Sequence, residues 1–408
     1  MLWKTTQFVA SWLIFSGVFQ YAMAWFYSFL FRRAQSDLQA QRIWPKAGIL
    51  LSLRGGDDDL PAALKSLLDQ DYPDYELHIV VDSERDSAWP IVTETVAASR
   101  CSNVFIGTLQ DRPPTCSPHC ASLVQAARQA DTCEILALVD GDVVAPKNWL
   151  RTLVAGLDRK EVGMVHGNRW YRFDQAEWGS AVRYCWNSAA VIVMTLCRFP
   201  WGGSCAMRRA DMFDAGVIDA WLTTLNQDNP ARLKMQQFGK QILFLPELMI
   251  LNNDAISLPN CTEFLSRQLL WAKLYSPTRQ WIYILIHGWS VLFVELLAVA
   301  LLVVGLATGN QPVTLASAAG LAVFLVAFPL ALLRNEKTVR QALERRGECL
   351  PKPTVRQTLN LIPAAIVTQV VYAVALFKAT TCRRLRWRNV EYEILGPWQN
   401  RVAEDVAA

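Results

Sequence analysis

The sequence contains neither a G-x-G-x-x-G run nor a P-loop lysine motif, the glycine-rich signatures that hold dinucleotides and ATP phosphates. Their absence argues against dinucleotide-binding and ATPase functions. A large excess of charge is also missing, because 40 basic and 36 acidic residues leave a net charge of +4 over 408 residues. Such a small excess gives no indication of a nucleic-acid partner.

A complete zinc-finger pattern is lacking too. Cys116, His119 and Cys120 lie close together, but no second pair of ligands follows at the spacing that such sites require. The 10 cysteines stand at irregular positions, which fits a reducing compartment better than a disulfide framework. We interpret His119 and His166 as ordinary packing or surface residues.

Apolar residues are abundant, at 52% of the chain, and they are clustered. Residues 8–31 contain no charge and are long enough to cross a bilayer. No small-x-small cleavage site precedes the globular part, so we expect an uncleaved anchor over residues 1–34. Basic residues flank it unequally: Lys4 before it, and Arg32, Arg33, Arg42 and Lys46 after it. The positive-inside rule then predicts that the next domain faces the cytoplasm.

Residues 47–260 alternate between strand-like and helix-like patches. Apolar runs at 48–53, 76–81 and 135–144 predict strands, and helical spacing at 60–68 and 121–130 predicts helices between them. Strands separated by helices imply crossover connections and a mostly parallel sheet with flanking helices. The predicted fold class is therefore α/β, of the nucleotide-binding kind, with transmembrane helices added.

The run at 135–144 ends on two carboxylates, Asp140 and Asp142, separated only by Gly141. Ligands of open α/β sheets gather beyond the carboxyl ends of the strands. Oxygen ligands of this kind suit Mg²⁺ or Mn²⁺, completed by substrate phosphates. The alternative is a solvated turn, because D-G is also ordinary turn chemistry.

Six motifs follow one another along the chain: L-S-L-R-G-G-D-D-D-L (51–60), L-L-D-Q-D-Y-P-D-Y-E-L-H-I-V-V-D-S (67–83), V-D-G-D (139–142), G-G-S-C-A-M-R-R (202–209), N-Q-D-N-P-A-R-L-K-M-Q-Q-F-G-K-Q-I (226–242) and R-Q-L-L-W (267–271). In this order and spacing they resemble the membrane-bound glycosyltransferases of family 2, which have the GT-A fold. The resemblance is strongest to the ceramide glucosyltransferase-like branch of that family.

The resemblance implies a role for each motif. Asp57 and Asp82 would face the nucleotide of the donor, and V-D-G-D would be the metal-binding D-x-D motif. Asp140 would also contact the substrate. Asp228 would be the catalytic base, and Arg267 with Trp271 would belong to the substrate-binding [QR]-x-x-R-W motif.

Each of these roles has a structural alternative. Asp228 precedes an N-P-A-R helix start and could be an N-cap, and Asp82 could form an Asx turn at a strand end. Arg267 and Trp271 could simply flank an interfacial helix over residues 261–280.

The chain departs from the family pattern at two positions. Gln227 replaces an acidic residue before the base, and Leu270 stands where the family has an arginine thought to help hold the pyrophosphate. Arg267 or Lys273 could compensate, because a phosphate accepts either type of cation.

Further apolar segments lie on both sides of these motifs. Residues 184–196 are too short to span comfortably and predict a membrane-surface or acceptor-lining helix, or else a buried core helix. Residues 281–380 hold three candidate spans, at 281–306, 313–333 and 359–379, and 381–408 form a basic tail. The last span has basic residues at both ends, so it could be re-entrant or place the tail outside.

The resemblance thus implies an inverting, metal-dependent glycosyltransferase that moves a sugar from a nucleotide donor, a UDP-sugar, to a membrane lipid. The acceptor would be ceramide-like or another glycolipid precursor in the bilayer. Two alternatives stay open. A processive polysaccharide synthase would want a complete Q-x-x-R-W motif and more spans, and a catalytically silent scaffold would account for Leu270 and Gln227.

Overall fold

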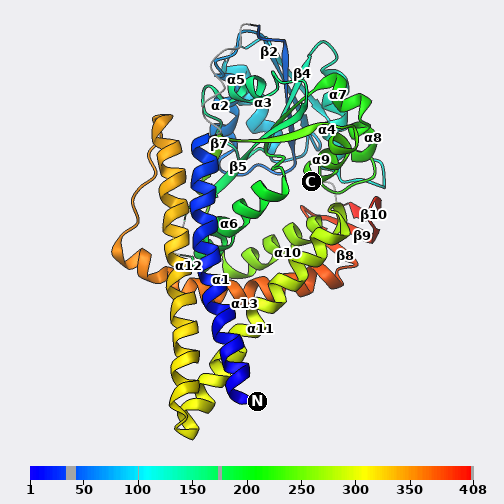
Figure 1. Cartoon of the computed structure of the whole chain (residues 1–408). Coiled ribbons are helices and arrows are strands. Elements are labelled where there is room, and N and C mark those ends of the chain that lie inside the picture. Colours follow the sequence, from blue (N-terminus) through cyan, green and yellow to red (C-terminus); the bar gives the residue numbers. More distant parts are fainter. Residues whose placement is uncertain (34–42, 100, 173–176, 406–408) are drawn as a thin grey trace.

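The computed structural model of the chain describes residues 1–33, 43–99, 101–172 and 177–405. An α/β domain stands at one end of a group of long helices (Figure 1). The predicted anchor lies in α1 (Leu2–Arg33), whereas Arg42, counted above for the membrane orientation, lies outside the described residues.

The α/β domain is built on a seven-stranded sheet with the strand order β3-β2-β1-β4-β6-β5-β7. Its strands are β1 (Ala47–Leu53), β2 (Tyr75–Val81), β3 (Val104–Thr108), β4 (Ile135–Val139), β5 (Val162–Tyr171), β6 (Ser204–Arg208) and β7 (Gln241–Asn252). Neighbouring strands from β3 to β4 are parallel, and β5 is parallel to β7. Only β6 runs antiparallel to its neighbours. The predicted mostly parallel sheet is confirmed.

Helices cover both faces of this sheet. They are α2 (Leu60–Leu68), α3 (Ala88–Ser99), α4 (Pro118–Gln129), α5 (Trp149–Gly156), α6 (Trp178–Cys197), α7 (Arg209–Asp214), α8 (Val217–Trp221) and α9 (Asp228–Gln237). In β1, Ile49 and Leu51 pack with α2, α3 and α5, while Leu50 points to the cluster formed with α4, α8 and α9. A strand buried on both faces needs apolar residues at successive positions, which explains the unbroken apolar runs.

Among the described residues, four helices are long and apolar enough to cross a membrane: α1, α11 (Thr278–Thr308), α12 (Gln311–Arg345) and α13 (Val355–Thr381). The predicted segments 281–306, 313–333 and 359–379 lie inside the last three. α1 packs along α12 (Figure 1). A Cβ at Gly17 would lie 3.1 Å from that of Ala327, so the missing side chain permits this close approach.

The last long helix differs from the others in its surroundings, because the chain contacts the α/β domain both before and after it. Before α13, Arg346 donates hydrogen bonds to the carbonyls of Glu247 and Met249, the latter at 2.7 Å. After α13, the amide of Val402 donates to the carbonyl of Pro114 at 2.7 Å. In Figure 1, α13 also runs across the direction of α1 and α12.

Residues 381–405 form more than a basic tail. They fold into a three-stranded antiparallel sheet of β8 (Arg384–Trp387), β9 (Val390–Gly396) and β10 (Gln399–Asp405), in the order β10-β9-β8. The segment 261–280, predicted as one interfacial helix, is divided: residues 261–275 lie in α10 (Leu258–Tyr275), and residues 278–280 begin α11. The small sheet and α10 together close one side of the α/β domain.

Candidate active site

A cleft with a cavity volume of about 290 Å³ opens at the carboxyl ends of β1, β2 and β4. Its lining includes all the residues that the motifs single out: Asp57, Asp82, Asp140, Asp142, Asp228, Arg267 and Trp271. The structure therefore brings together side chains separated by more than two hundred positions in the sequence.

The loop after β4 directs both carboxylates of the D-x-D motif toward one side chain, the guanidinium of Arg169. Arg169, from β5, lies with Nη2 2.6 Å from Asp140 Oδ2 and with Nη1 2.8 Å from Asp142 Oδ2. Gly141 lets the turn pack closely against β1, because a Cβ there would lie only 2.6 Å from Leu53 Cδ2 and would displace that side chain. The turn is thus shaped so that two carboxylates converge, and it is more than a solvated strand end.

The glycine pair after α6 joins the D-x-D loop to Asp228. A Cβ on Gly203 would collide with the carboxylate of Asp140, so only glycine leaves room for it. The amide of neighbouring Gly202 donates to Asp228 Oδ2 at 3.3 Å. Asp228 also accepts hydrogen bonds from the Asn226 side chain and, at 2.7 Å, from the amide of Asn229. Asp140 and Asp228 consequently face the same corner of the cleft.

Asp228 is the first residue of α9, and the N-cap position belongs to Gln227. The carboxylate is therefore not the helix cap that the sequence allowed as an alternative, although its negative charge suits a helix N-terminus. Burial raises the pKa of Asp228 to about 6, despite the lowering effect of its backbone hydrogen bonds. A carboxyl group tuned toward neutral pH is suited to exchange a proton.

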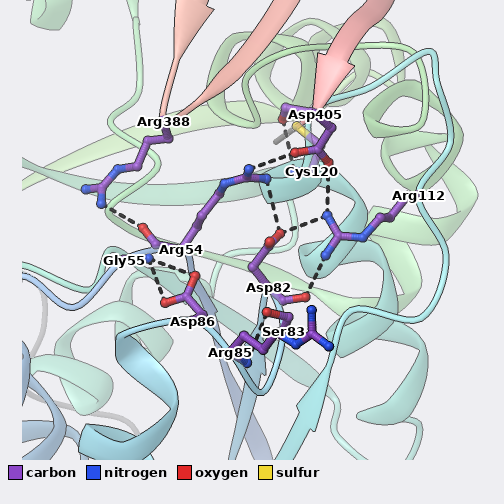
Figure 2. Close-up of polar contacts among 11 residues, drawn as sticks. Arg54, Gly55, Asp82, Ser83, Arg85, Asp86, Arg112, Cys120, Arg388 and Asp405 are labelled. Atoms are coloured by element: carbon purple, nitrogen blue, oxygen red, sulfur yellow. Dashed lines mark hydrogen bonds and ion pairs between the residues drawn. The ribbon is translucent and has the colours of Figure 1, made fainter. Parts of the chain in front are cut away.

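Asp82 ends β2 inside a network of alternating charges. Its Oδ1 accepts from Arg112 at 3.0 Å and from Arg54 at 3.3 Å, and both guanidiniums also reach Asp405 of β10 (Figure 2). Among the residues that the structure describes, its buried Oδ2 has no hydrogen-bond partner. One oxygen of Asp82 is thus held by two guanidiniums, and the other is buried without a hydrogen-bond partner among the described residues.

The loop after β1 carries Asp57 at the edge of the cleft. Asp86 fixes this loop, because its carboxylate accepts from the amides of Gly55 and Ala88 at 2.9 and 2.8 Å. Asp57 pairs with Arg388 of the turn between β8 and β9, at 2.9 Å. The C-terminal sheet hence reaches the same cleft as the predicted nucleotide ligands.

Helix α10 presents one face to the cleft, made of Phe264, Arg267, Gln268 and Trp271. Leu270 does not line the cleft and lies in a buried apolar cluster. Lys273 is directed elsewhere, because its Nζ donates to the carbonyls of Ala379 and Thr380 at 3.2 and 2.8 Å. Of the two residues expected to compensate for Leu270, only Arg267 reaches the site.

Helix α6 has features of both helix types predicted for residues 184–196, the membrane-surface or acceptor-lining helix and the buried core helix. Val191 is fully buried, whereas Val193 and Leu196 are 37% and 49% exposed. Asn187 and Met194 of the same helix line the cleft. The segment is therefore partly a core helix and partly an apolar wall that extends from the cleft to the surface.

Sequence reasoning missed several cleft residues, among them Arg169, His119 and Arg388. Arg169 stands in a strand that gave no separate signal, and only the fold shows that it meets the D-x-D loop. His119 was interpreted as packing, yet it lines the cleft, and burial lowers the pKa of its imidazole. His166 is an ordinary core residue, as expected, with its Nδ1 2.8 Å from the carbonyl of Gly167.

A family comparison agrees with this arrangement. The profile of glycosyl transferase family 21 matches residues 9–398, from α1 to the C-terminal sheet. The chain belongs to glycosyl transferase family 21. The glycosyltransferase class inferred from the motifs is confirmed, and with the apolar helices the family makes the chain a membrane protein.

One solved structure shows the same fold, and a second is more distantly similar. Mannosyltransferase PcManGT from Pyrobaculum calidifontis, in complex with GDP-Man and Mn²⁺, is 16% identical, with a TM-score of 0.50 over 92% of this chain and 99% of that chain. S. aureus TarS 1–349 in complex with UDP is 13% identical, with a TM-score of 0.36 over 88% and 99% of the two chains. At 16% identity the first likeness shows the fold alone, and this fold is the predicted GT-A type.

Proposed function

We propose that this family 21 glycosyltransferase moves a sugar from a UDP-sugar to a membrane lipid, with inversion at the sugar carbon. One observation carries the proposal: Asp82, the D-x-D pair and Asp228 share a single cleft, in the order that a nucleotide, a diphosphate and an acceptor hydroxyl require. The mannosyltransferase of similar fold holds a nucleotide sugar and Mn²⁺, which supports a donor of this class.

The nucleotide base would bind at Asp82. The free, buried Oδ2 of this carboxylate can accept an N–H bond from a uracil ring, while Arg54 and Arg112 hold the other oxygen in place. A buried acceptor without a partner is energetically unfavourable, so a ligand that supplies the donor is favoured. Asp57, at the edge of the cleft, would contact the same nucleotide.

The residues present fit a divalent cation at the D-x-D loop. Asp140 and Asp142 already place three carboxylate oxygens within 3.0 Å of a single guanidinium. These are hard oxygen donors of the type that Mg²⁺ and Mn²⁺ prefer. Bound there, the ion would offset the negative charge that develops on the departing diphosphate. Arg169 would have to yield this place, because its guanidinium occupies it while lying over the Trp201 ring at 4.6 Å.

Asp228 would act on the acceptor. A lipid hydroxyl is a poor nucleophile until its proton is removed, and a positioned base is typically worth about 10²–10⁴-fold in rate. The raised pKa of Asp228 gives its carboxylate more affinity for that proton than an ordinary aspartate has. Attack from the side opposite the diphosphate then inverts the sugar carbon.

The membrane would deliver the acceptor along α6. Val193 and Leu196 are exposed apolar residues on a helix whose neighbouring residues line the cleft. An alkyl chain lying against this wall would bring its polar end to Asp228.

We further infer that α1, α11 and α12 span the bilayer and that α13 lies in its surface. A spanning helix places its flanking segments on opposite sides, whereas the segments before and after α13 both contact the α/β domain, and α13 runs across the direction of α1 and α12 (Figure 1). Its exposed apolar residues also recur every three or four positions, as on one face of an interfacial helix: Val355, Leu359, Ile362, Ile366, Val370, Val374 and Phe377. This arrangement removes the conflict with the positive-inside rule, because both basic flanks of α13 stay on the cytoplasmic side.

Two measurements test the proposal. Lipids from cells that express the wild type, but not Asp142→Asn, should contain a hexosylated species by mass spectrometry. In calorimetry with purified protein, UDP should bind tightly with Mn²⁺ and at least about tenfold more weakly with a chelator or with Asp142→Asn. Asp158→Asn, an exposed carboxylate on the same domain, is the matched control. Equal UDP affinity in metal and in chelator would refute the metal site.

A further inference from the structure

The turn between β8 and β9 holds an arginine in an unfavourable backbone conformation. Arg388 and Asn389 have φ angles of 49° and 60°, and they lie between the paired residues Trp387 and Val390. Positive φ at both central positions is the type I′ turn, which favours Asn and Gly. A long side chain is strained there, and such strain is typically kept where a side chain has a task.

This turn directs the guanidinium of Arg388 into the cleft. Its Nη1 donates to the carbonyl of Arg54 at 2.7 Å, and its Nη2 lies 2.9 Å from Asp57. Gly55 admits it, because a Cβ there would lie 3.1 Å from Arg388 Nη1. The Arg388 and Asp57 side chains are 44% and 51% exposed, so water screens their ion pair and another anion can replace Asp57.

Arg267 contributes a second guanidinium to the part of the cleft that Arg388 reaches. Arg267 lies over the rings of Trp387 and Phe264, 5.4 and 5.8 Å from their centres. Within the described part of the chain, no carboxylate forms an ion pair with Arg267. Burial, followed by repulsion from Arg388, lowers the pKa of Arg267 to about 10. An anion between these side chains would remove that repulsion.

We propose that Arg388 is a donor-binding residue, whose guanidinium holds the diphosphate of the nucleotide sugar together with that of Arg267. This inference rests on the proposed function and goes beyond it. It assigns the binding of the diphosphate, for which Leu270 offers no charged group, to a residue of the C-terminal sheet. Guanidinium forks bind phosphate oxygens in pairs, and a diphosphate offers enough oxygens for two of them. The family match includes this turn, since it extends to residue 398.

The test compares UDP with uridine, which lacks the diphosphate. Binding of each to the purified full-length protein is measured by calorimetry in detergent with Mn²⁺. Arg388→Asn removes the charge and keeps a residue that tolerates positive φ, so the turn should persist. Arg388→Lys keeps the charge without the fork. Arg386→Asn is the control, because Arg386 is exposed on the same strand.

We expect Arg388→Asn to weaken UDP binding about 10- to 100-fold, the usual loss for a hydrogen bond to a charged group. Uridine affinity should stay within about twofold, Arg388→Lys should give an intermediate UDP affinity, and Arg386→Asn should match the wild type. An unchanged UDP affinity in Arg388→Asn would overturn the proposal, and so would equal losses for UDP and uridine. If the wild type itself failed to bind UDP, the proposed function would be refuted rather than the role of Arg388 within it.

Discussion

Replacing Asp228 by asparagine should stabilise the protein while it abolishes transfer. The pKa of Asp228 is raised from 3.8 to about 6 in the folded state, with burial as the main cause. The protonated carboxyl group is therefore favoured in the fold. Its contribution to stability is complete below pH 3.8 and lost as the pH rises through about 6, above which the buried carboxylate destabilises the native state.

The size of this effect follows from the same shift. A change of about two pKa units corresponds to roughly 3 kcal/mol, and the partial exposure of Asp228 reduces this to about 1–2 kcal/mol. Asparagine carries no charge and fits the same space, but it loses the 3.3 Å bond from the Gly202 amide, so Asp228→Asn should raise the melting temperature by only about one to three degrees at pH 7.5. The gain should shrink as the pH falls from 6 toward 4.

Thermal unfolding in detergent measures this, with Asp219→Asn as the matched control. Asp219 also lies in the first turn of a short helix, but it is exposed, so its replacement should leave the melting temperature within about a degree. Transfer activity should fall by about 10²–10⁴-fold in Asp228→Asn only. A melting temperature of Asp228→Asn at or below that of the wild type at pH 7.5 would show that the Asp228 carboxylate does not destabilise the folded protein.

Three further outcomes are expected. The kcat/KM of the wild type should fall tenfold per pH unit below about pH 6, where Asp228 becomes protonated, and a flat profile down to pH 5 would argue against a base with this pKa. Val193→Asp and Leu196→Asp, both on the exposed edge of α6, should reduce transfer to long-chain acceptors by about tenfold or more while sparing short soluble ones; equal losses on both would contradict a lipid-lining role. An impermeant maleimide added from the cytoplasmic side should label both Cys349, which is exposed, and the cysteine of Arg386→Cys. Labelling of the two from opposite sides would show that α13 spans the bilayer.

The parts of the fold that the sequence predicts share one physical property. β1, β2 and β4 are largely buried and mostly apolar, and acidic residues, Asp82 and Asp140, mark the points where β2 and β4 end. The carboxyl ends of these parallel strands meet at one edge of the sheet. Asp82 and Asp140 could therefore be placed in one cleft from their positions alone.

The remaining features depend on contacts that local patterns do not record. The pairing of Arg388 with Asp57, and of Asp405 with Arg54, joins the last sheet to the first strand of the domain. Nothing in the composition of a short basic segment specifies such a contact. For the same reason the sequence shows that α13 is apolar but not that the segments on both sides of it contact one domain, which only the tertiary contacts reveal.

Val191 illustrates a further limit. Sequence alone makes Val191 and Val193 equivalent members of an apolar helix, and both would be chosen to test a lipid groove. The structure separates them, because Val191 is fully buried and Val193 is 37% exposed. An aspartate at Val191 would therefore report on folding, whereas one at Val193 tests the proposed lipid-lining role of the exposed surface.

We propose that the residues of this cleft catalyse the transfer of a sugar to a lipid, with Asp228 as the base. The most direct test of this proposal is transfer of labelled sugar from UDP-sugars into the lipid fraction by the purified protein in lipid nanodiscs with Mn²⁺. We predict a glycolipid product of inverted anomeric configuration for the wild type and for Asp219→Asn, and none above background for Asp228→Asn. A lipid product formed equally by Asp228→Asn, or a retained configuration, would contradict the account.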